Sequence, residues 1–342
     1  MSSLKSFLGK NLLVLALIAV VYSWFFAFHY VPQKTHDTST QVLGADTNIT
    51  LFIEPDSGRA QILDAINSAQ KEILVEVYLL SDKQIIQSLE DAKQRGVAVD
   101  VMLEQHPFGG GSLNNTSEKE LEAHNISFEW TNSSFTLTHE KSIVIDGNEA
   151  FILNQNLTTS SFTKNREYDV LDTNPEDVKE VRDIFISDWK RKSFSPPSTT
   201  HLIVSPINSR AGLTTLLTNS TQTIDIEIED IVDDQITFLL SDKAKNTKIR
   251  LIIPTLSQIT SNKKDVEKLK NSGVEIKTLS SPYVHAKLIL VDGIKAYVGS
   301  VNLSTQSMDE NRELGIILSQ SDSLQVISST FENDWNKGKD LN

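Results

Sequence analysis

The sequence predicts an α/β protein built from two similar halves, each a sheet flanked by helices. Its 342 residues are enough for about two domains of roughly 150 residues each. Strand-like apolar alternation and helix-like apolar periods follow one another along most of the chain, which is the pattern of an α/β fold. A stretch of about fifty residues also recurs 146 positions later without a gap, with His285 against His139.

In the first half, the spacing of apolar residues predicts alternating strands and helices. Val75, Val77 and Leu79 alternate with Glu76 and Tyr78, which predicts a strand. The next amphipathic segment ends near a glycine, a residue type that often terminates helices. We expect strands over 49–53, 72–80 and 97–103, and helices over 58–71 and 83–94.

The second half follows the same order. We expect strands over 201–204, 223–231, 248–253 and 274–279, and helices over 209–218, 234–244 and 264–271. Residues 193–198 read Ser-Phe-Ser-Pro-Pro-Ser, which predicts a linker. The predicted domains are therefore 47–195 and 199–342, preceded by an N-terminal segment over 1–31 and a polar tether over 32–46.

The repeated stretch carries the same polar side chains at the same spacing in both halves. An Asp-Gly pair in each copy predicts a hairpin turn. The returning strands, over 149–153 and 295–298, would bring an asparagine beside each His-Lys strand. The matched residues are His139, Lys141, Asp146, Asn156 and Glu167 in the first half, and His285, Lys287, Asp292, Asn302 and Glu313 in the second.

The spacing of His and Lys indicates a phosphate site. Two residues apart on a strand, they lie on one face. Burying an ammonium group costs several kcal/mol unless an anion accompanies it. Two such strands, each with an asparagine nearby, indicate a phosphate site divided between the halves, in which lysines neutralise charge and amides bind the oxygens. Histidine is competent both as a nucleophile and as a general acid near neutral pH.

The motif H-x-K-x(4)-D occurs twice with a downstream asparagine, and the second copy continues as Gly299-Ser300-Val301-Asn302. In these features the chain resembles the phospholipase D superfamily over nearly all of its length after the N-terminal segment. The resemblance implies two mixed-sheet domains related by a pseudo-twofold axis and sharing one active site. It also implies a metal-independent phosphodiesterase without a cofactor.

The resemblance further implies roles for the paired residues. His139 is expected to attack phosphorus and form a phosphohistidine, and His285 to act as general acid and then general base. The sequence itself does not distinguish the two histidines. Glu167 and Glu313 are expected to orient the imidazoles, and an ion pair with a nearby arginine is the alternative for each.

Other residues of the motifs are expected to shape the hairpins or to contact phosphate. Asp146 and Asp292 lie at turns, which favours a structural role. Ser300 is expected to contact phosphate, and Asn154 to replace it as a hydrogen-bond donor in the first copy. Leu153 stands where the second copy has a glycine, and it would bring a bulky side chain to a position of close backbone approach.

The N-terminal segment predicts a membrane anchor. Lys5 and Lys10 precede an uncharged apolar run over 12–28, and aromatic residues crowd its far end. These flanks favour an uncleaved signal anchor, with a single-pass, membrane-anchored protein whose catalytic part is extracytoplasmic. A cleaved signal peptide and secretion are the alternative.

Charge and composition limit the partners. The chain carries 32 Lys and Arg against 45 Asp and Glu, for a net charge of −13, and has no cysteine. An acidic chain lacks the wide basic surface of sequence-blind nucleic-acid binders, and thiolate chemistry is excluded. No metal is expected, because no His, Asp and Glu cluster has ligand spacing. A monomer is expected, since one chain holds both half-sites.

The expected substrate is a phosphodiester, most simply a phospholipid. The main interpretation is a phospholipase D-type enzyme that hydrolyses or transfers the head group of a glycerophospholipid to give phosphatidate. The alternatives are a membrane-tethered nuclease and a cardiolipin synthase-like phosphatidyltransferase. A degenerate binding protein is disfavoured because both His-Lys pairs are intact.

Overall fold

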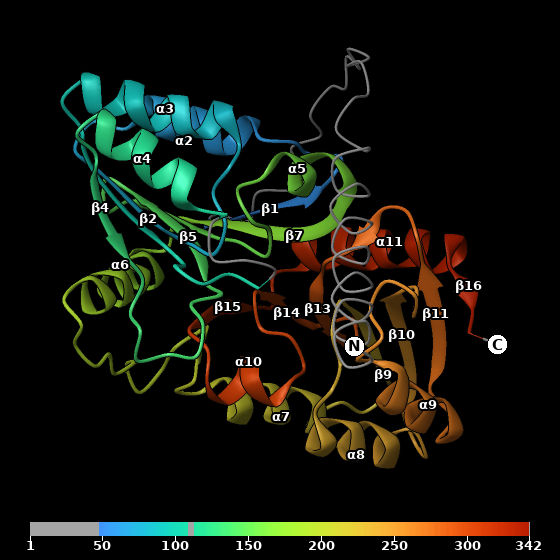
Figure 1. Ribbon diagram of the computed structural model, residues 1–342. Helices are drawn as coiled ribbons and strands as arrows, with labels where there is room; N and C mark the ends of the chain where they lie inside the picture. The colour runs from blue at the N-terminus through green and yellow to red at the C-terminus, as the bar shows by residue number, and fades with distance from the viewer. Residues whose placement is uncertain (1–47, 109–112, 342) are drawn as a thin grey trace, which may run out of the picture. The chain divides into compact units, whose positions relative to one another are not determined.

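The computed structural model describes residues 48–108 and 113–341, which form two eight-stranded sheets (Figure 1). In each sheet three neighbouring strands are parallel and the other main pairings are antiparallel. Helices cover the outer faces of both sheets. The prediction of two similar α/β halves, each a mixed sheet flanked by helices, is confirmed.

The first sheet has the strand order β1-β7-β6-β5-β2-β3-β4, and its eighth strand, β12 (Tyr283–Val284), pairs with β7 off this path. Its strands are β1 (Ile49–Glu54), β2 (Glu72–Val77), β3 (Ala98–Leu103), β4 (Ser127–Trp130), β5 (Lys141–Ile145), β6 (Glu149–Ile152) and β7 (Asn165–Asp172). Its helices are α2 (Ala60–Ser68), α3 (Lys83–Gln94), α4 (Asn115–Ala123), α5 (Thr159–Lys164) and α6 (Pro175–Trp189). An aspartate cap begins α3, where Asp82 accepts hydrogen bonds from the backbone N–H groups of Gln84 and Ile85.

The second sheet has the order β16-β11-β10-β9-β13-β14-β15-β8. Its strands are β8 (Leu202–Ser205), β9 (Thr223–Ile228), β10 (Lys248–Pro254), β11 (Glu275–Leu279), β13 (Lys287–Val291), β14 (Lys295–Gly299), β15 (Glu313–Leu318) and β16 (Lys339–Asp340). Its helices are α7 (Ser209–Thr218), α8 (Asp234–Lys243), α9 (Lys263–Asn271), α10 (Thr305–Asp309) and α11 (Ser321–Lys337).

Three apolar cores explain why these elements pack as layers. One core lies between the first sheet and α2, α3 and α4, and a second between the second sheet and α7, α8 and α9. The third is shared by both halves and contains residues of both sheets together with α6 and α11. The shared core buries one face of each sheet, so it joins the two halves by apolar packing.

Backbone pairing between the halves fixes the position of both repeated motifs. Strand β12 (Tyr283–Val284) precedes His285 in the second half but pairs with β7 of the first sheet. The reciprocal contact is a bridge between Thr138 and Arg312, after which the His139 N–H donates to the Arg312 carbonyl at 2.8 Å. Each histidine is therefore placed by the half that does not contain it.

The loop expected before Glu167 and Glu313 contains structure that the sequence pattern did not predict. The short helices α5 and α10 occupy most of it, and each carboxylate lies at the beginning of a buried strand, β7 or β15. Strand β7 escaped prediction because it carries charged residues, such as Arg166 and Glu167, whose partners come from the other half. These side chains hide the apolar alternation of an ordinary strand. Strand β15 has one charged residue, Glu313, at its beginning and continues as an apolar run.

The predicted single-pass, membrane-anchored location is contradicted. Within residues 48–108 and 113–341, no helix is long and apolar enough to cross a bilayer. The longest of those helices, α11, has 17 residues and carries several charges, whereas a span needs about 20 mostly apolar residues. The segment on which the prediction rested, residues 1–31, lies outside the described residues, as does the tether over 32–46.

Candidate active site

The two histidines are held by carboxylates from opposite halves. His139 Nδ1 lies 2.9 Å from Glu313 Oε2, and His285 Nδ1 lies 2.7 Å from Glu167 Oε2. Both glutamates are fully buried, and each histidine keeps a small exposed fraction. Because a carboxylate only accepts, Nδ1 carries the proton and Nε2 is left for chemistry.

The Asn-Arg-Glu segments explain how the glutamates are fixed. Asn165 Nδ2 donates to Glu167 Oε1 at 2.9 Å, and the same bond in the second half measures 3.1 Å. The neighbouring arginine does not pair with the glutamate. Instead Arg166 pairs with Asp334 at 2.5 Å, and Arg312 pairs with Asp188 at 2.7 Å. These buried ion pairs also cross between halves, so they join the two sheets directly behind the site.

The imidazole of His139 lies in surroundings that favour its neutral form. Burial lowers the pKa of His139 to about 4, although the attraction of Glu313 opposes this shift. Burial alone would raise the pKa of the Glu313 carboxyl, but His139 beside it outweighs burial and holds that pKa below its usual value. When the Nδ1–H group of a neutral imidazole donates a hydrogen bond to a carboxylate, Nε2 keeps the lone pair that a nucleophile needs.

The two lysines are buried at the base of the site. Lys141 Nζ donates to the His139 carbonyl at 2.6 Å, and Lys287 Nζ donates to the His285 carbonyl at 2.7 Å. Each lysine thus braces the backbone of the histidine two residues before it. Burial lowers the pKa of Lys141 to about 7, against the attraction of Glu313. An anion entering the site would supply the negative charge that balances the protonated form of Lys141.

The predicted amide and hydroxyl residues fall into two groups. Asn156 is buried and Asn302 is half-buried, and the Oδ1 atom of each is buried without a hydrogen-bond partner. Asn154 is fully buried, and its Nδ2 donates to the His285 carbonyl at 3.2 Å. Ser300 is fully buried and bonds to the backbone of Leu314. Contact of Asn154 and Ser300 with phosphate stays a prediction, because both side chains are engaged by backbone groups.

The aspartates of the motif lie at the hairpin tips, at the other end of each strand from the lysine. Asp146 has a φ of 53° and accepts three backbone N–H bonds, from Gln70, Lys71 and Glu72. Asp292 has the same φ and accepts the equivalent bonds from residues 221–223. Each carboxylate therefore ties its hairpin to the beginning of the neighbouring strand.

The second copy has Gly299 where the first has Leu153, and the surroundings of each residue explain the difference. A Cβ on Gly299, whose φ is 155°, would lie 2.3 Å from the Gly315 Cα and 2.9 Å from the Tyr297 hydroxyl. In the first half Leu153 is fully buried in the outer core at this position, with its N–H donating to the Lys141 carbonyl at 2.9 Å. The side chain of Leu153 therefore packs away from the imidazoles, and the first half-site keeps its shape.

Sequence reasoning missed two residues that contact the histidines. Glu229 Oε2 lies 3.1 Å from Lys287 Nζ and 3.5 Å from His285 Nε2. The Tyr78 ring meets the His139 ring edge-on, with 4.7 Å between centroids. Both residues lie inside the predicted strands, 72–80 and 223–231, and directly follow the observed strands β2 and β9. Aligning the two halves by strand register would have placed them at equivalent positions.

Three carboxyl groups outside the imidazole pairs lie close enough together to hold a metal ion. Within the described ranges this group is Glu76, Glu140 and Asp188, whose oxygens lie within 4.8 Å of one another. Arg312 already pairs with Asp188. Burial raises the pKa of Glu76 well above its usual value and that of Glu140 to about 7. Protons and the guanidinium can therefore balance these charges without a metal ion.

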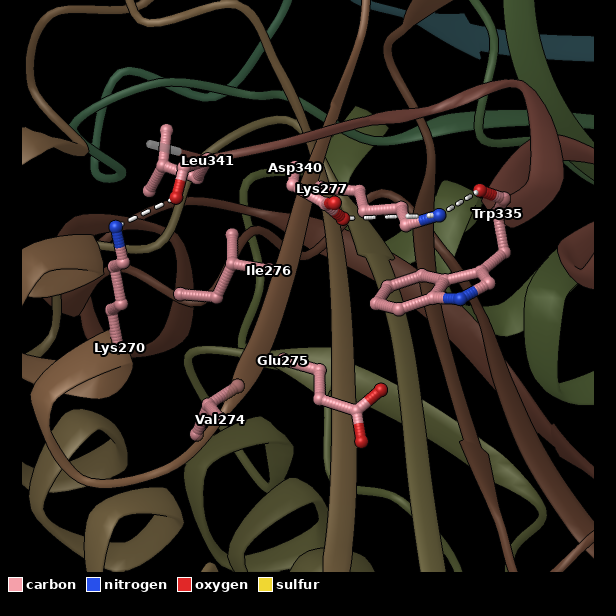
Figure 2. A pocket seen from close by; sticks show the side chains of 8 residues that line it. All are labelled: Lys270, Val274, Glu275, Ile276, Lys277, Trp335, Asp340 and Leu341. Carbon is pink, nitrogen blue, oxygen red and sulfur yellow. Dashed lines mark hydrogen bonds and ion pairs between the residues drawn. The ribbon is translucent and has the colours of Figure 1, made fainter.

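A surface pocket lies near the C-terminal strand β16. Figure 2 shows that its lysines are occupied: Lys270 Nζ donates to the Leu341 carbonyl at 2.7 Å, and Lys277 Nζ donates to the Trp335 carbonyl at 3.1 Å. Neither His139 nor His285 lines it. The pocket therefore carries no chemistry comparable to that of the paired histidines.

Comparison with known proteins identifies the family of this chain. The family model described as "Cardiolipin synthase, PLD-like domain" matches residues 62–189 and 213–335. Cardiolipin synthase 1 of Bacillus anthracis is 21% identical over 344 residues, covering 86% of this chain and 68% of the relative. A cardiolipin synthase of Geobacillus thermodenitrificans is 23% identical, covering 81% of this chain and 64% of the relative. The chain thus spans about two thirds of the length of these relatives.

A solved structure shows the same fold across both halves. The phosphatidylserine synthase of Haemophilus influenzae superposes with a TM-score of 0.67 at 12% identity, covering 88% of this chain and 89% of that one. Each of the two segments matched by the family model contains one His-Lys motif with its asparagine and glutamate. The chain therefore belongs to the phospholipase D superfamily, within the family of cardiolipin synthase PLD-like domains.

Proposed function

We propose that this protein is a phosphatidyltransferase of the cardiolipin synthase type that works through a phosphohistidine on His139. The observation that carries the proposal is the crosswise pairing of each histidine with a glutamate of the other half. This pairing leaves two Nε2 atoms for proton and phosphoryl chemistry in one site. The matched family and the cardiolipin synthases among its relatives support a lipid phosphodiester as substrate.

In the first step the neutral His139 Nε2 attacks the phosphorus of a phosphatidyl donor. A P–N bond forms while the P–O bond to the head-group alcohol breaks, and His285 gives its proton to the leaving oxygen. Lys141 and Lys287 neutralise charge on the nonbridging oxygens. Glu313 stabilises the positive charge that develops on the attacking imidazole.

In the second step the hydroxyl group of an acceptor lipid gives its proton to His285. Its oxygen attacks phosphorus, a new P–O bond forms, and the P–N bond breaks to restore neutral His139. If the acceptor is phosphatidylglycerol and the donor is also phosphatidylglycerol, the products are cardiolipin and glycerol. If water takes the place of the acceptor, the product is phosphatidate, as the phospholipase D interpretation expects.

Product analysis separates these outcomes. The purified full-length chain would be incubated with phosphatidylglycerol vesicles in EDTA, and separately with single-stranded DNA. We expect cardiolipin and glycerol in equal amounts and intact DNA. Phosphatidate without cardiolipin would replace the transferase with a hydrolase, and cleavage of DNA alone would replace both with a nuclease. Loss of all activity in EDTA would contradict a mechanism that uses only side chains.

A further inference from the structure

The two half-sites differ at one equivalent position, occupied by Tyr78 in the first half and Glu229 in the second. Strand β2 pairs Val77 with Lys141, and β9 pairs Ile228 with Lys287. The next residue in each half makes the same backbone bond. Tyr78 N–H donates to the Glu140 carbonyl at 3.1 Å, and Glu229 N–H donates to the Ala286 carbonyl at 3.0 Å. The difference therefore concerns the side chains alone.

In the second half this position adds a negative charge. Glu229 Oε2 lies 3.1 Å from Lys287 Nζ and 3.5 Å from His285 Nε2. Its other oxygen accepts a hydrogen bond from the Tyr283 hydroxyl at 2.9 Å. Burial opposes ionisation of Glu229, but Lys287 and His285 outweigh it and lower the pKa of Glu229 to about 2. The carboxylate is therefore ionised throughout the working pH range.

In the first half the same position adds no charge. The Tyr78 ring meets His139 edge-on, and Lys141 Nζ lies 5.4 Å from the ring centroid. The Tyr78 hydroxyl points elsewhere and accepts the Phe108 N–H. Burial raises the pKa of Tyr78 to about 12, so its hydroxyl stays neutral. His139 consequently has a carboxylate at one ring nitrogen only.

In the described residues a carboxylate lies near each ring nitrogen of His285. Glu167 on β7 contacts Nδ1, and Glu229, directly after β9, faces Nε2. Lys287, the first residue of β13, is paired with Glu229. Lys141, across the site, interacts electrostatically with both carboxylates. An imidazole between two carboxylates gains from protonation at both nitrogens, whereas one beside a single carboxylate and an aromatic ring gains less.

We propose that Glu229 is the positioning residue that keeps His285 protonated and thereby commits His285, rather than His139, to protonating the leaving alcohol. In the first step the proton moves from His285 Nε2 to the leaving oxygen as the P–O bond breaks, and the carboxylate balances the imidazolium until then. The catalytic part of this inference rests on the proposed phosphohistidine mechanism. The effect of Glu229 on the protonation of His285 does not.

A second role for Glu229 makes opposite predictions. The carboxylate contacts Lys287, which is also a predicted phosphate ligand, so Glu229 could simply compete with the substrate anion. In that case Glu229→Gln would lower KM and leave kcat unchanged. If Glu229 keeps His285 protonated, Glu229→Gln lowers kcat instead, and most strongly at alkaline pH.

The test compares two substrates in wild type and Glu229→Gln. One is phosphatidylglycerol, whose alkoxide must be protonated as it leaves. The other is a phosphatidyl ester of p-nitrophenol, whose phenolate leaves without a proton. An opposite charge nearby shifts a titration by about one unit or more, which is tenfold in protonated fraction. At pH 8 we expect the variant to lose at least about tenfold on phosphatidylglycerol and less than about twofold on the phenyl ester.

Matched variants complete the design. Glu229→Asp should recover part of the loss, because it restores the charge. Asp230→Asn removes the neighbouring carboxylate, which bonds Ser261 at 3.0 Å rather than a histidine, and should behave as wild type. Equal losses on both substrates, or a lower KM with kcat intact, would overturn the proposal.

A measurement without turnover separates this inference from the proposed function. Imidazole nitrogen NMR of the full chain, assigned with His285→Asn, reports the protonation of His285 directly. We expect His285 to lose its proton at lower pH in Glu229→Gln than in wild type. An unchanged titration would refute the role of Glu229 whatever the substrate. An inactive wild type with a shifted titration would refute the proposed function alone.

Discussion

Replacing Glu313 with glutamine removes the charge that holds the attacking histidine. The carboxylate is fully buried and lies 2.9 Å from His139 Nδ1, so water cannot take its place. A hydrogen bond to a charged group contributes about 1.5 to 3 kcal/mol. The interaction strengthens as His139 becomes positive in the transition state. Its loss should therefore slow formation of the phosphoenzyme by about 10- to 150-fold.

The assay is a single-turnover reaction with phosphatidylglycerol, quenched in denaturant and read as covalent adduct by mass spectrometry. Glu310→Gln provides the control, because the Glu310 carboxylate is exposed and accepts a hydrogen bond from the Thr136 hydroxyl at 3.3 Å rather than from a histidine. Unfolding curves would confirm that both variants are folded. A rate for Glu313→Gln within twofold of wild type would refute the claim that this carboxylate stabilises the attacking imidazole.

Three further predictions concern pH and stability. We expect kcat/KM to rise with pH through about 4, as His139 loses its proton, and to fall above about 7, as Lys141 loses its proton. A flat pH profile between about pH 6 and 9 would contradict the limb assigned to Lys141. Burial raises the pKa of Glu140 from 4.5 to about 7. The unfolded chain therefore loses this proton at lower pH than the folded chain, and the free energy of unfolding falls as the pH rises from about 4.5 to 7. Glu140→Gln should then stabilise the chain by roughly 2 to 3 kcal/mol at pH 9 and hardly at pH 4 in urea unfolding; equal effects at both pH values would exclude this cause. Asp334→Asn leaves the buried Arg166 without its 2.5 Å partner and should cost about 3 to 5 kcal/mol; a loss below about 1 kcal/mol would show that the pair does not hold the halves together.

The fold could be predicted because its main signals are local. Apolar periods identified the sheets and outer helices, and the ungapped repeat identified two equivalent halves. Strand β7 was missed because residues such as Arg166 and Glu167 look like a solvated loop until their partners are known. Those partners, Asp334 and His285, lie more than a hundred positions away, and no local pattern indicates a contact of that kind.

The residue types of the site could also be predicted, but their connections could not. The sequence brought His139 and His285 together by their motifs without showing which glutamate holds which histidine. That pairing depends on two short backbone contacts between the halves. One is the pairing of β12 with β7, and the other is the bridge between Thr138 and Arg312. Glu229 was missed because a carboxylate at a strand end has the appearance of a surface residue, and only packing shows that it faces an imidazole.

Mapping the covalent intermediate tests the central claim most directly. The full-length chain would be mixed with phosphatidylglycerol in EDTA, quenched in denaturant, digested and examined by mass spectrometry. The proposed mechanism predicts a phosphatidyl adduct on His139 that is trapped in the wild type, forms more slowly in His285→Asn and is absent from His139→Asn. An adduct on His285 that persists in His139→Asn, or product formed by the wild type without any histidine adduct, would contradict it.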